Sequence, residues 1–166
     1  MLMSRNITIR PCKRNENFLS ISKLYLRVWK TAYKSLLSQK FLSKLNEGSW
    51  KPQKRWKNTM IAENKKKEIV GVCSFGPTRF KRFPKYGEIY SLYVDKDYQD
   101  IGVGSKLIKQ SLKKLKRDKY KSFFVWVIYN NSPAINFYKK VGFKDPHIYR
   151  VDHSKFGDVK EMIMLL

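Results

Sequence analysis

The chain has 166 residues, enough for one compact domain whose hydrophobic core needs neither disulfides nor a metal. A hydrophobic fraction of 42% and an aromatic fraction of 14% exclude a disordered polycation, although 36 Lys and Arg against 13 Asp and Glu give a net charge of +23. Such a charge attracts polyanions, but Lys greatly outnumbers Arg and is scattered along the chain, which favours a solvated basic surface over a dedicated nucleic-acid interface.

Membrane, disulfide and metal chemistry find no support in the sequence. The N-terminus is too polar for a secretory signal, and no apolar run approaches the roughly 20 residues that cross a bilayer. We therefore expect a cytoplasmic protein with no membrane partner. Cys12 and Cys73 lie in strand-like segments, which predicts buried thiols. His147 and His153 have no metal-ligand spacing to these cysteines, so no metal is expected.

The first half of the chain predicts one strand, several helices and a hairpin. Apolar side chains at three- and four-residue steps indicate an amphipathic first helix, and Pro52 is suited to open a later helical piece. The expected elements are a strand over 7–12, helices over 18–32, 36–45 and 50–57, hairpin strands over 59–63 and 68–75, and a basic loop over 76–87.

The second half alternates strands with helices. The run from 122 to 129 is apolar, aromatic and β-branched, as in a buried central strand, and Gly142 is placed to end the last helix. The expected elements are strands over 88–94, 122–129, 143–151 and 160–166, and helices from 103 to about 117 and over 131–141. This order predicts one α/β domain over 1–166, with a mixed sheet of six or seven strands flanked by helices.

A glycine-containing turn lies between a predicted strand and a predicted helix, from Gln99 to Ser105. Glycines let backbone N–H groups approach phosphate oxygens, and the N-terminus of the following helix favours an anion. A tight turn without a ligand is the alternative interpretation. The Rossmann and Walker patterns are excluded, because Leu107 stands where a third glycine is needed and Ser105 precedes Lys106.

The turn and a later segment together resemble a known family. The pattern is Gln99-x-x-Gly102-x-Gly104, followed by Asn131-x-x-Ala134-x-x-Phe137-Tyr138 and then Gly142-Phe143. These two blocks, in this order, resemble the GCN5-related N-acetyltransferase (GNAT) superfamily. The resemblance covers about 60 residues, and it implies an acyl-CoA N-acyltransferase fold, acetyl-CoA as cosubstrate and an amine as acceptor.

The resemblance also implies residues that bind the coenzyme. The strand before the turn would offer backbone partners to the pantetheine arm, the turn would hold the pyrophosphate, and the last helix would line the thioester end. These residues are Leu92, Tyr93, Val94, Gln99, Asp100, Ile101, Gly102, Val103, Gly104, Ser105, Asn131 and Ala134. Many relatives have a small residue and then a cation at the positions of Asp100 and Ile101, so the phosphate grip is expected to be weaker here.

Acetylation of an amine needs a base and a donor for the departing thiolate, since an alkylammonium with a pKa near 10.4 is protonated at pH 7. The resemblance suggests Tyr138 as the donor and Glu88 as the base. Core packing for Tyr138 and a solvated strand-start carboxylate for Glu88 remain the alternatives. The acceptor is expected near Trp29, Thr31, Tyr33 and the cations at 79–86, although these aromatics are equally suited to a core.

Two other functions remain open at this point. The chain could be a catalytically degenerate GNAT module that binds coenzyme A or nucleic acid, or an acetyltransferase of protein N-termini associated with ribosomes. The favoured hypothesis is transfer of the acetyl group to a primary amine of a small molecule or peptide by direct attack on the thioester. The acceptor, the acyl chain and the oligomeric state, including a homodimer, stay undetermined.

Overall fold

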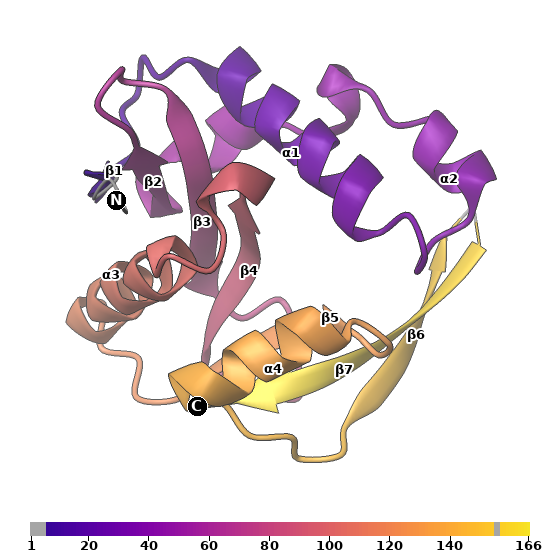
Figure 1. Ribbon diagram of the computed structural model, residues 1–166. Coiled ribbons are helices and arrows are strands. Elements are labelled where there is room, and N and C mark those ends of the chain that lie inside the picture. The colour runs from indigo at the N-terminus through magenta and orange to yellow at the C-terminus, as the bar shows by residue number, and fades with distance from the viewer. Residues whose placement is uncertain (1–5, 155–156) are drawn as a thin grey trace.

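The computed structural model describes residues 6–154 and 157–166, which form one seven-stranded mixed sheet with helices on both faces (Figure 1). The strands follow the order β1-β2-β3-β4-β5-β7-β6. The elements are β1 (Thr8–Pro11), α1 (Phe18–Ala32), α2 (Gln39–Ser43), η1 (Glu47–Ser49), η2 (Pro52–Asn58), β2 (Thr59–Glu63), β3 (Ile69–Pro77), β4 (Gly87–Val94), η3 (Lys96–Tyr98), α3 (Val103–Arg117), β5 (Phe123–Ile128), α4 (Ser132–Val141), β6 (Tyr149–Ser154) and β7 (Gly157–Leu165).

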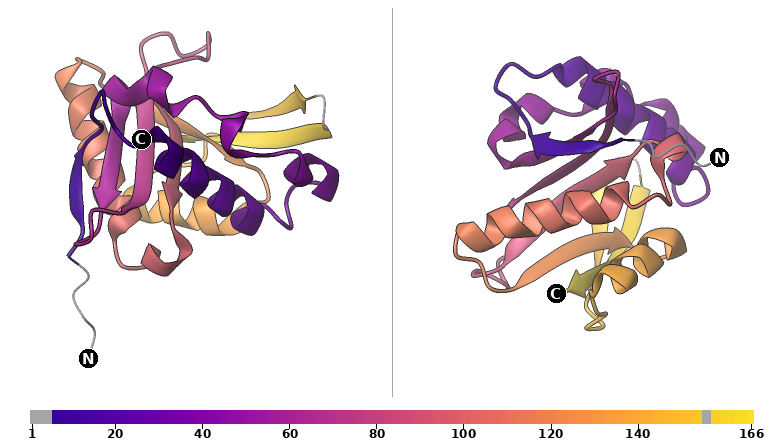
Figure 2. Two further views of the ribbon diagram at one scale, coloured as in Figure 1. Left: turned by 90° about the horizontal axis from the view of Figure 1, so that it is seen from above. Right: turned by 60° about the vertical axis from the view of Figure 1, so that its left-hand side comes forward.

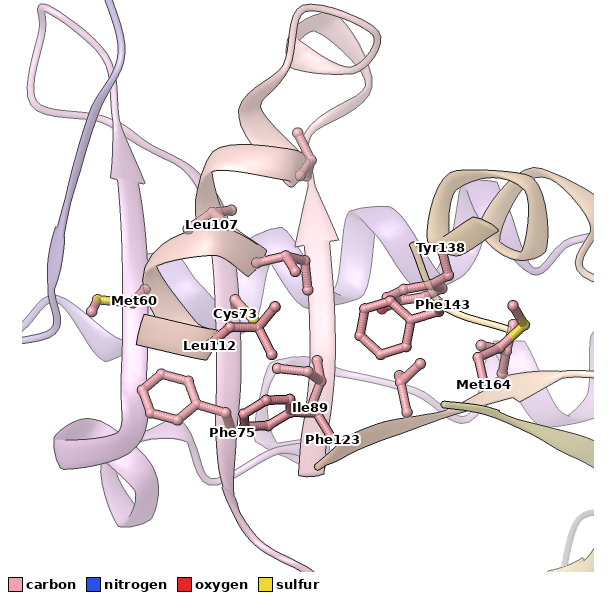
Figure 3. Close-up of a cluster of buried hydrophobic side chains, with 14 of the residues drawn as sticks. Met60, Cys73, Phe75, Ile89, Leu107, Leu112, Phe123, Tyr138, Phe143 and Met164 are labelled. Carbon is pink, nitrogen blue, oxygen red and sulfur yellow. The ribbon is translucent and has the colours of Figure 1, made fainter. Parts of the chain in front are cut away.

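The helices divide between the two faces of the sheet. In Figure 2, α3 and α4 lie side by side over one face, and α1 lies over the other. The apolar side of α1 packs on β2 and β3 through Ile21, Leu24 and Val28. A larger cluster forms under α3 and α4, where Leu107 and Tyr138 meet side chains from most of the strands (Figure 3). The sheet therefore separates two layers, each with its own core.

A bulge in β4 changes which face its side chains meet. Opposite β3, Phe75 pairs with Ile89 but the next residue, Ser74, pairs with Ser91, so Tyr90 is the extra residue. Ile89 and Leu92 consequently point into the same α3 and α4 layer, although strict alternation would separate them. Tyr90 is turned out of the ladder, and its hydroxyl donates to the carbonyl of Pro77 at 2.6 Å.

The strands β4 and β5 separate soon after they meet. They pair in parallel only where Gly87–Ile89 faces Phe123–Val125. Beyond these pairs, β4 continues to Val94 and β5 to Ile128 with no further pairing between them. The edge of β4 that faces β5 therefore keeps backbone donors and acceptors that the sheet does not use.

Most predicted elements agree with the structure. The mixed α/β sheet with flanking helices is confirmed, as are the hairpin strands, the helix from Val103 and the stop at Gly142, whose φ is +109°. Cys12 and Cys73 are buried and unpaired, and burial raises the pKa of their thiols to about 11 and about 12. None of the described helices combines the length and apolar character needed to span a bilayer.

The strand predicted over 143–151 is wrong in its first part. Only Lys144 makes a bridge there, to Leu165, and regular pairing begins at Tyr149 in β6. The segment between them turns instead, because the carboxylate of Asp145 accepts a hydrogen bond from the backbone of His147 at 2.7 Å. His147 has a φ of +58°, which an extended strand cannot accommodate.

The first strand is fixed to the second by a compact ion cluster. The guanidinium of Arg10 donates to Glu16 at 2.6 Å and to Glu63 at 2.7 Å, and both carboxylate side chains are only 8% exposed. These hydrogen bonds to Arg10 hold the pKa of Glu16 and of Glu63 below the usual range. Stabilisation from such carboxylates is complete above the unfolded-state pKa, near 4.3, and disappears as the pH falls toward the folded-state values.

Replacing Arg10 should therefore change how the free energy of unfolding depends on pH below about pH 5. We expect Arg10→Met to lower the free energy of unfolding at pH 7 by about 2 kcal/mol, because Glu16 then keeps only backbone N–H donors and Glu63 keeps only the exposed Lys67. The deficit should shrink between about pH 5 and pH 3 as these carboxylates become protonated. Urea denaturation at several pH values measures this. Arg14→Met, at an exposed residue, is the control, and an equal deficit at pH 3 and pH 7 would contradict the assignment.

Candidate active site

The predicted phosphate-binding turn leads from the end of β4 into the first turn of α3. The side-chain amide of Gln99 donates to the carbonyl of Val94 at 2.9 Å, which holds the turn against the strand. Gly102 is the residue before α3, with a φ of +85° that favours glycine and no side-chain cap. The first helical hydrogen bond of α3 runs from the N–H of Lys106 to the carbonyl of Gly102 at 3.1 Å, so the backbone N–H groups at 103–105 have no partner within the helix.

The second glycine of the turn has a packing role. A Cβ atom on Gly104 would lie 3.2 Å from the ring of Phe137 in α4, closer than nearly all such contacts. Glycine therefore lets the N-terminus of α3 approach α4 directly. Gly102 and Gly104 thus serve different needs, one conformational and one steric, and both keep the free amides of the turn accessible.

A cavity of about 460 Å³ lies where β4 and β5 separate, and it connects both faces of the sheet. On the α3 and α4 side it is lined by the turn, by α4 and by Leu92 and Val94. On the α1 side it is lined by aromatic residues of α1 and by side chains from β5, β6 and β7. Predicted site residues that line it are Trp29, Tyr33, Leu92, Tyr93, Val94, Gln99, Asp100, Gly104, Asn131, Ala134 and Tyr138.

Tyr138 lies in α4 at the inner wall of this cavity. Its ring packs edge-on against Phe137 at 5.2 Å and Phe143 at 5.3 Å, measured between ring centroids (Figure 3). Burial raises the pKa of its phenol well above 10, so the hydroxyl carries its proton at neutral pH. Among the described residues, this hydroxyl has no hydrogen-bond partner, which leaves it available to a bound group. The core-packing and donor interpretations are compatible, since the ring packs in the core and Tyr138 also lines the cavity.

Aromatic side chains close the opposite wall. Trp29 and Tyr33 of α1 meet edge-on at 4.7 Å, and Trp29 lies 6.5 Å from Tyr93 between ring centroids. Burial, assisted by the negative charge of Glu161, raises the pKa of Tyr33 to about 12. The part of the α1 side formed by α1 itself is therefore aromatic, and the hydroxyl of Tyr33 is neutral at pH 7.

Glu88 does not reach this cavity. Its side chain is 1% exposed, and its two oxygens accept from the backbone N–H of Arg79 at 2.7 Å and from the guanidinium of Arg79 at 2.6 and 3.1 Å. Arg79 lines the cavity whereas Glu88 lies outside the lining. The solvated strand-start alternative for Glu88 is wrong, because this carboxylate is a buried anchor for the loop that follows β3.

Three acidic residues do line the cavity: Asp100 on the turn, and Asp152 and Glu161 on the β6–β7 hairpin. Glu161 accepts a hydrogen bond from Nε of Arg150 at 2.6 Å, and that guanidinium stacks over the ring of Trp126 at 3.9 Å. This group was not predicted from the sequence. The available signal was an acidic residue at a two-residue step from Val159 and Ile163, and therefore on their strand face, but only the antiparallel pairing of β6 with β7 brings Glu161 opposite Arg150.

The remaining predicted residues lie at the margin of the site or away from it. Thr31 is exposed on α1, and its hydroxyl donates to the carbonyl of Arg27 at 2.9 Å, so it does not line the cavity. Val103 is buried in the core, where only its backbone is part of the turn. Ile101 is 45% exposed on the turn. Ile101, Gly102 and Ser105 belong to the turn but do not line the cavity.

The fold and the cavity agree with a family comparison. The sequence profile of the acetyltransferase (GNAT) family matches residues 22–143, which is well over half of the chain. The chain therefore belongs to the GNAT acetyltransferase family. It is 32% identical over 137 residues to the uncharacterised N-acetyltransferase YuaI of Bacillus subtilis, a match that spans 80% of this chain and 78% of YuaI.

Further relatives agree at lower coverage or identity. An N-alpha-acetyltransferase of Sulfurisphaera tokodaii is 34% identical over 91 residues, half of this chain and 54% of that protein. Among solved structures, the PaiA N-acetyltransferase of Thermoplasma acidophilum, in complex with coenzyme A, gives a TM-score of 0.72 at 17% identity, with 95% of this chain and 98% of that chain covered. Likeness at this identity shows the shared fold.

Proposed function

We propose that this protein transfers the acetyl group of acetyl-CoA to a primary amine of a small molecule or peptide. One observation carries the proposal: a single cavity passes through the gap between β4 and β5 and joins the turn before α3, at Gly104, to a chamber on the other face that is lined by aromatic and charged side chains. A thioester held from one side and an amine entering from the other would meet at Tyr138. PaiA of Thermoplasma acidophilum, which shares the fold, was solved with coenzyme A bound.

The residues present fit a coenzyme A molecule. The backbone N–H groups at 103–105 and the positive end of α3 suit a pyrophosphate. The unpaired edge of β4 at Leu92–Val94 suits an extended arm that contains amides, since such an arm can bond to a sheet edge like a strand. Asn131, whose side chain caps α4, and Ala134 line the end of the cavity near Tyr138.

Acetyl-CoA supplies an acyl group on a good leaving thiolate. The ammonium first loses one proton, which passes to solvent through the base, and the free amine then attacks the thioester carbonyl directly, so the C–N bond forms and the C–S bond breaks. The second proton that leaves the nitrogen replaces the one that the donor gives to the sulfur. Tyr138, with its hydroxyl protonated and unpaired, would donate to the sulfur. On the acceptor side, we assign Glu161 to receive the ammonium proton, because this carboxylate lines the cavity and Glu88 does not. Oε2 of Glu161 accepts from Arg150, and Oε1 is outside this bond.

The direct test has two measurements on the full chain. Calorimetry at moderate ionic strength should detect saturable binding of coenzyme A. Thiol release from acetyl-CoA should then rise with amines from a panel of polyamines, aminoglycosides, amino acids and peptide N-termini, the last included because of the match to an N-alpha-acetyltransferase. Coenzyme A binding without release of thiol by any amine would favour a degenerate binding module, and no binding at all would overturn the proposal.

A further inference from the structure

A second pocket lies beside the acceptor chamber. It has a volume of about 520 Å³ and is formed mainly by η2, with Arg79 and Tyr90 on its other side. Arg79 and Tyr90 also line the cavity that passes through the sheet, so the two spaces share one wall. The family comparison and the proposed reaction assign no role to this second pocket.

The lining of this pocket is strongly basic. It includes Lys54, Arg55, Lys57 and Arg79, and none of its lining residues is acidic. Among the described residues, no carboxylate forms an ion pair with Lys54, Arg55 or Lys57. Arg79 is paired with Glu88. One oxygen of Glu88 accepts from the backbone N–H of Arg79, and the other accepts from Nε and Nη2 of its guanidinium, so Nη1 is outside these bonds. The pocket therefore gathers three positive charges, on Lys54, Arg55 and Lys57, that no described carboxylate pairs with, beside Arg79, whose charge is paired with Glu88.

Two of these cations, the exposed Arg55 and the half-exposed Arg79, contact one aromatic ring. The guanidinium carbons of Arg55 and Arg79 lie 4.6 Å and 4.2 Å from the ring centroid of Tyr90. Tyr90 is itself fixed, because its hydroxyl is bonded to Pro77 and its ring fits against Gly76, where a Cβ atom would lie 2.5 Å from the hydroxyl oxygen. The bulge in β4 thus places Tyr90 where two guanidinium groups contact its ring, and guanidinium groups are suited to bidentate binding of phosphate or carboxylate.

We infer that this basic pocket binds an anionic group of the acceptor, a phosphate or a carboxylate, while the amine of the same molecule reaches the chamber beside Glu161. The inference rests on the proposed acetyl transfer, and it narrows the acceptor to a small amine that also carries an anion. A polyamine is disfavoured, because its second charge would meet Arg55 and Arg79. The shared wall of Arg79 and Tyr90 is the point at which one molecule would span both spaces.

The acceptor arm of the test compares amines that differ only in the anion. O-phosphoethanolamine, β-alanine and ethanolamine are offered with saturating acetyl-CoA. We expect kcat/KM for at least one anionic amine to exceed that for ethanolamine by at least about ten-fold at low salt, since charge-assisted bonds to fixed guanidinium groups are strong. The triple substitution Lys54→Gln, Arg55→Gln and Lys57→Gln should remove this advantage and leave the ethanolamine rate and the coenzyme A affinity unchanged.

A matched control removes the same charge elsewhere. Lys65→Gln, Lys66→Gln and Lys113→Gln also remove three positive charges, at exposed residues of the β2–β3 turn and of α3, and should keep the preference for the anionic amine. Equal rates for all three amines, or equal losses in both triple variants, would overturn the inference. Binding of a short single-stranded RNA that only the pocket variant loses, with no preference among the amines, would overturn it in favour of a nucleic-acid site.

A binding arm separates failure of this inference from failure of the proposed function. Inorganic phosphate, titrated at constant ionic strength, should shift the NMR amide signals of residues 54–58 and Arg79 saturably in the native chain and not in the pocket variant. Acetyl transfer without any such shift or preference overturns the anion site alone. Saturable shifts without coenzyme A binding overturn the acetyl transfer, and with it the assignment of the anion to an acceptor.

Discussion

Tyr138→Phe is expected to lower kcat by about 100-fold or more, within the range that a positioned general acid contributes. The substitution removes one oxygen and keeps the ring, whose contacts with Phe137 and Phe143 give it its place in the core. The thiolate would then leave without a donor, so the loss should appear in kcat. The measurement is steady-state release of thiol from acetyl-CoA with the best acceptor of the panel.

The same variant should keep its fold and its coenzyme. Calorimetry should give a dissociation constant for coenzyme A within about two-fold of the native value, since the proposed binding groups are backbone amides of the turn and of β4. Tyr129→Phe, at an exposed tyrosine outside the cavity lining, is the matched control and should leave kcat unchanged. A native kcat in Tyr138→Phe would remove this hydroxyl from the mechanism.

The turn and the helix to which we assign the coenzyme were predictable as chain geometry, because they depend on local sequence. The turn from Gln99 to Gly104 connects a strand with a helix that the sequence already indicates, and Asn131 caps the helix that carries Tyr138. Motif spacing fixes these relationships within about 45 residues. Even there, the sequence did not reveal that Gly104 is needed for contact with Phe137, because that contact joins two helices across a buried strand.

The acceptor side was not predictable in the same way. Glu88 follows the basic loop in sequence and was the expected base, yet the side chain of Arg79 folds back over it and closes it off. Glu161 lies near the end of the chain and reaches the cavity only because β7 inserts between β5 and β6. A long-range strand order of this kind leaves no short motif. The bulge at Tyr90 is a further case, since one extra residue in β4 decides which face Tyr90 serves.

The acidic residue that acts on the amine can be identified by comparing two isosteric variants. Deprotonating an alkylammonium with a pKa near 10.4 at pH 7 costs roughly 4.6 kcal/mol, so loss of the base should be severe. We expect Glu161→Gln to lower kcat/KM at pH 7 by about 100-fold, while the amide oxygen can still accept from Arg150. Glu88→Gln should instead lower the free energy of unfolding by about 1–3 kcal/mol, because it weakens a buried charged contact, with kcat/KM near the native value.

The pH profile distinguishes a base from a side chain that only shapes the pocket. If Glu161 takes the ammonium proton, the deficit of Glu161→Gln should shrink as the pH rises toward the pKa of the amine, since free amine then replaces the missing proton transfer. A purely structural defect would persist at every pH. The two carboxylates lie on the same side of the sheet, but only Glu161 lines the cavity. The contrary result would be a loss of kcat/KM in Glu88→Gln alone that shrinks as the pH rises. It would make Glu88 the base and would require its ion pair with Arg79 to open during turnover.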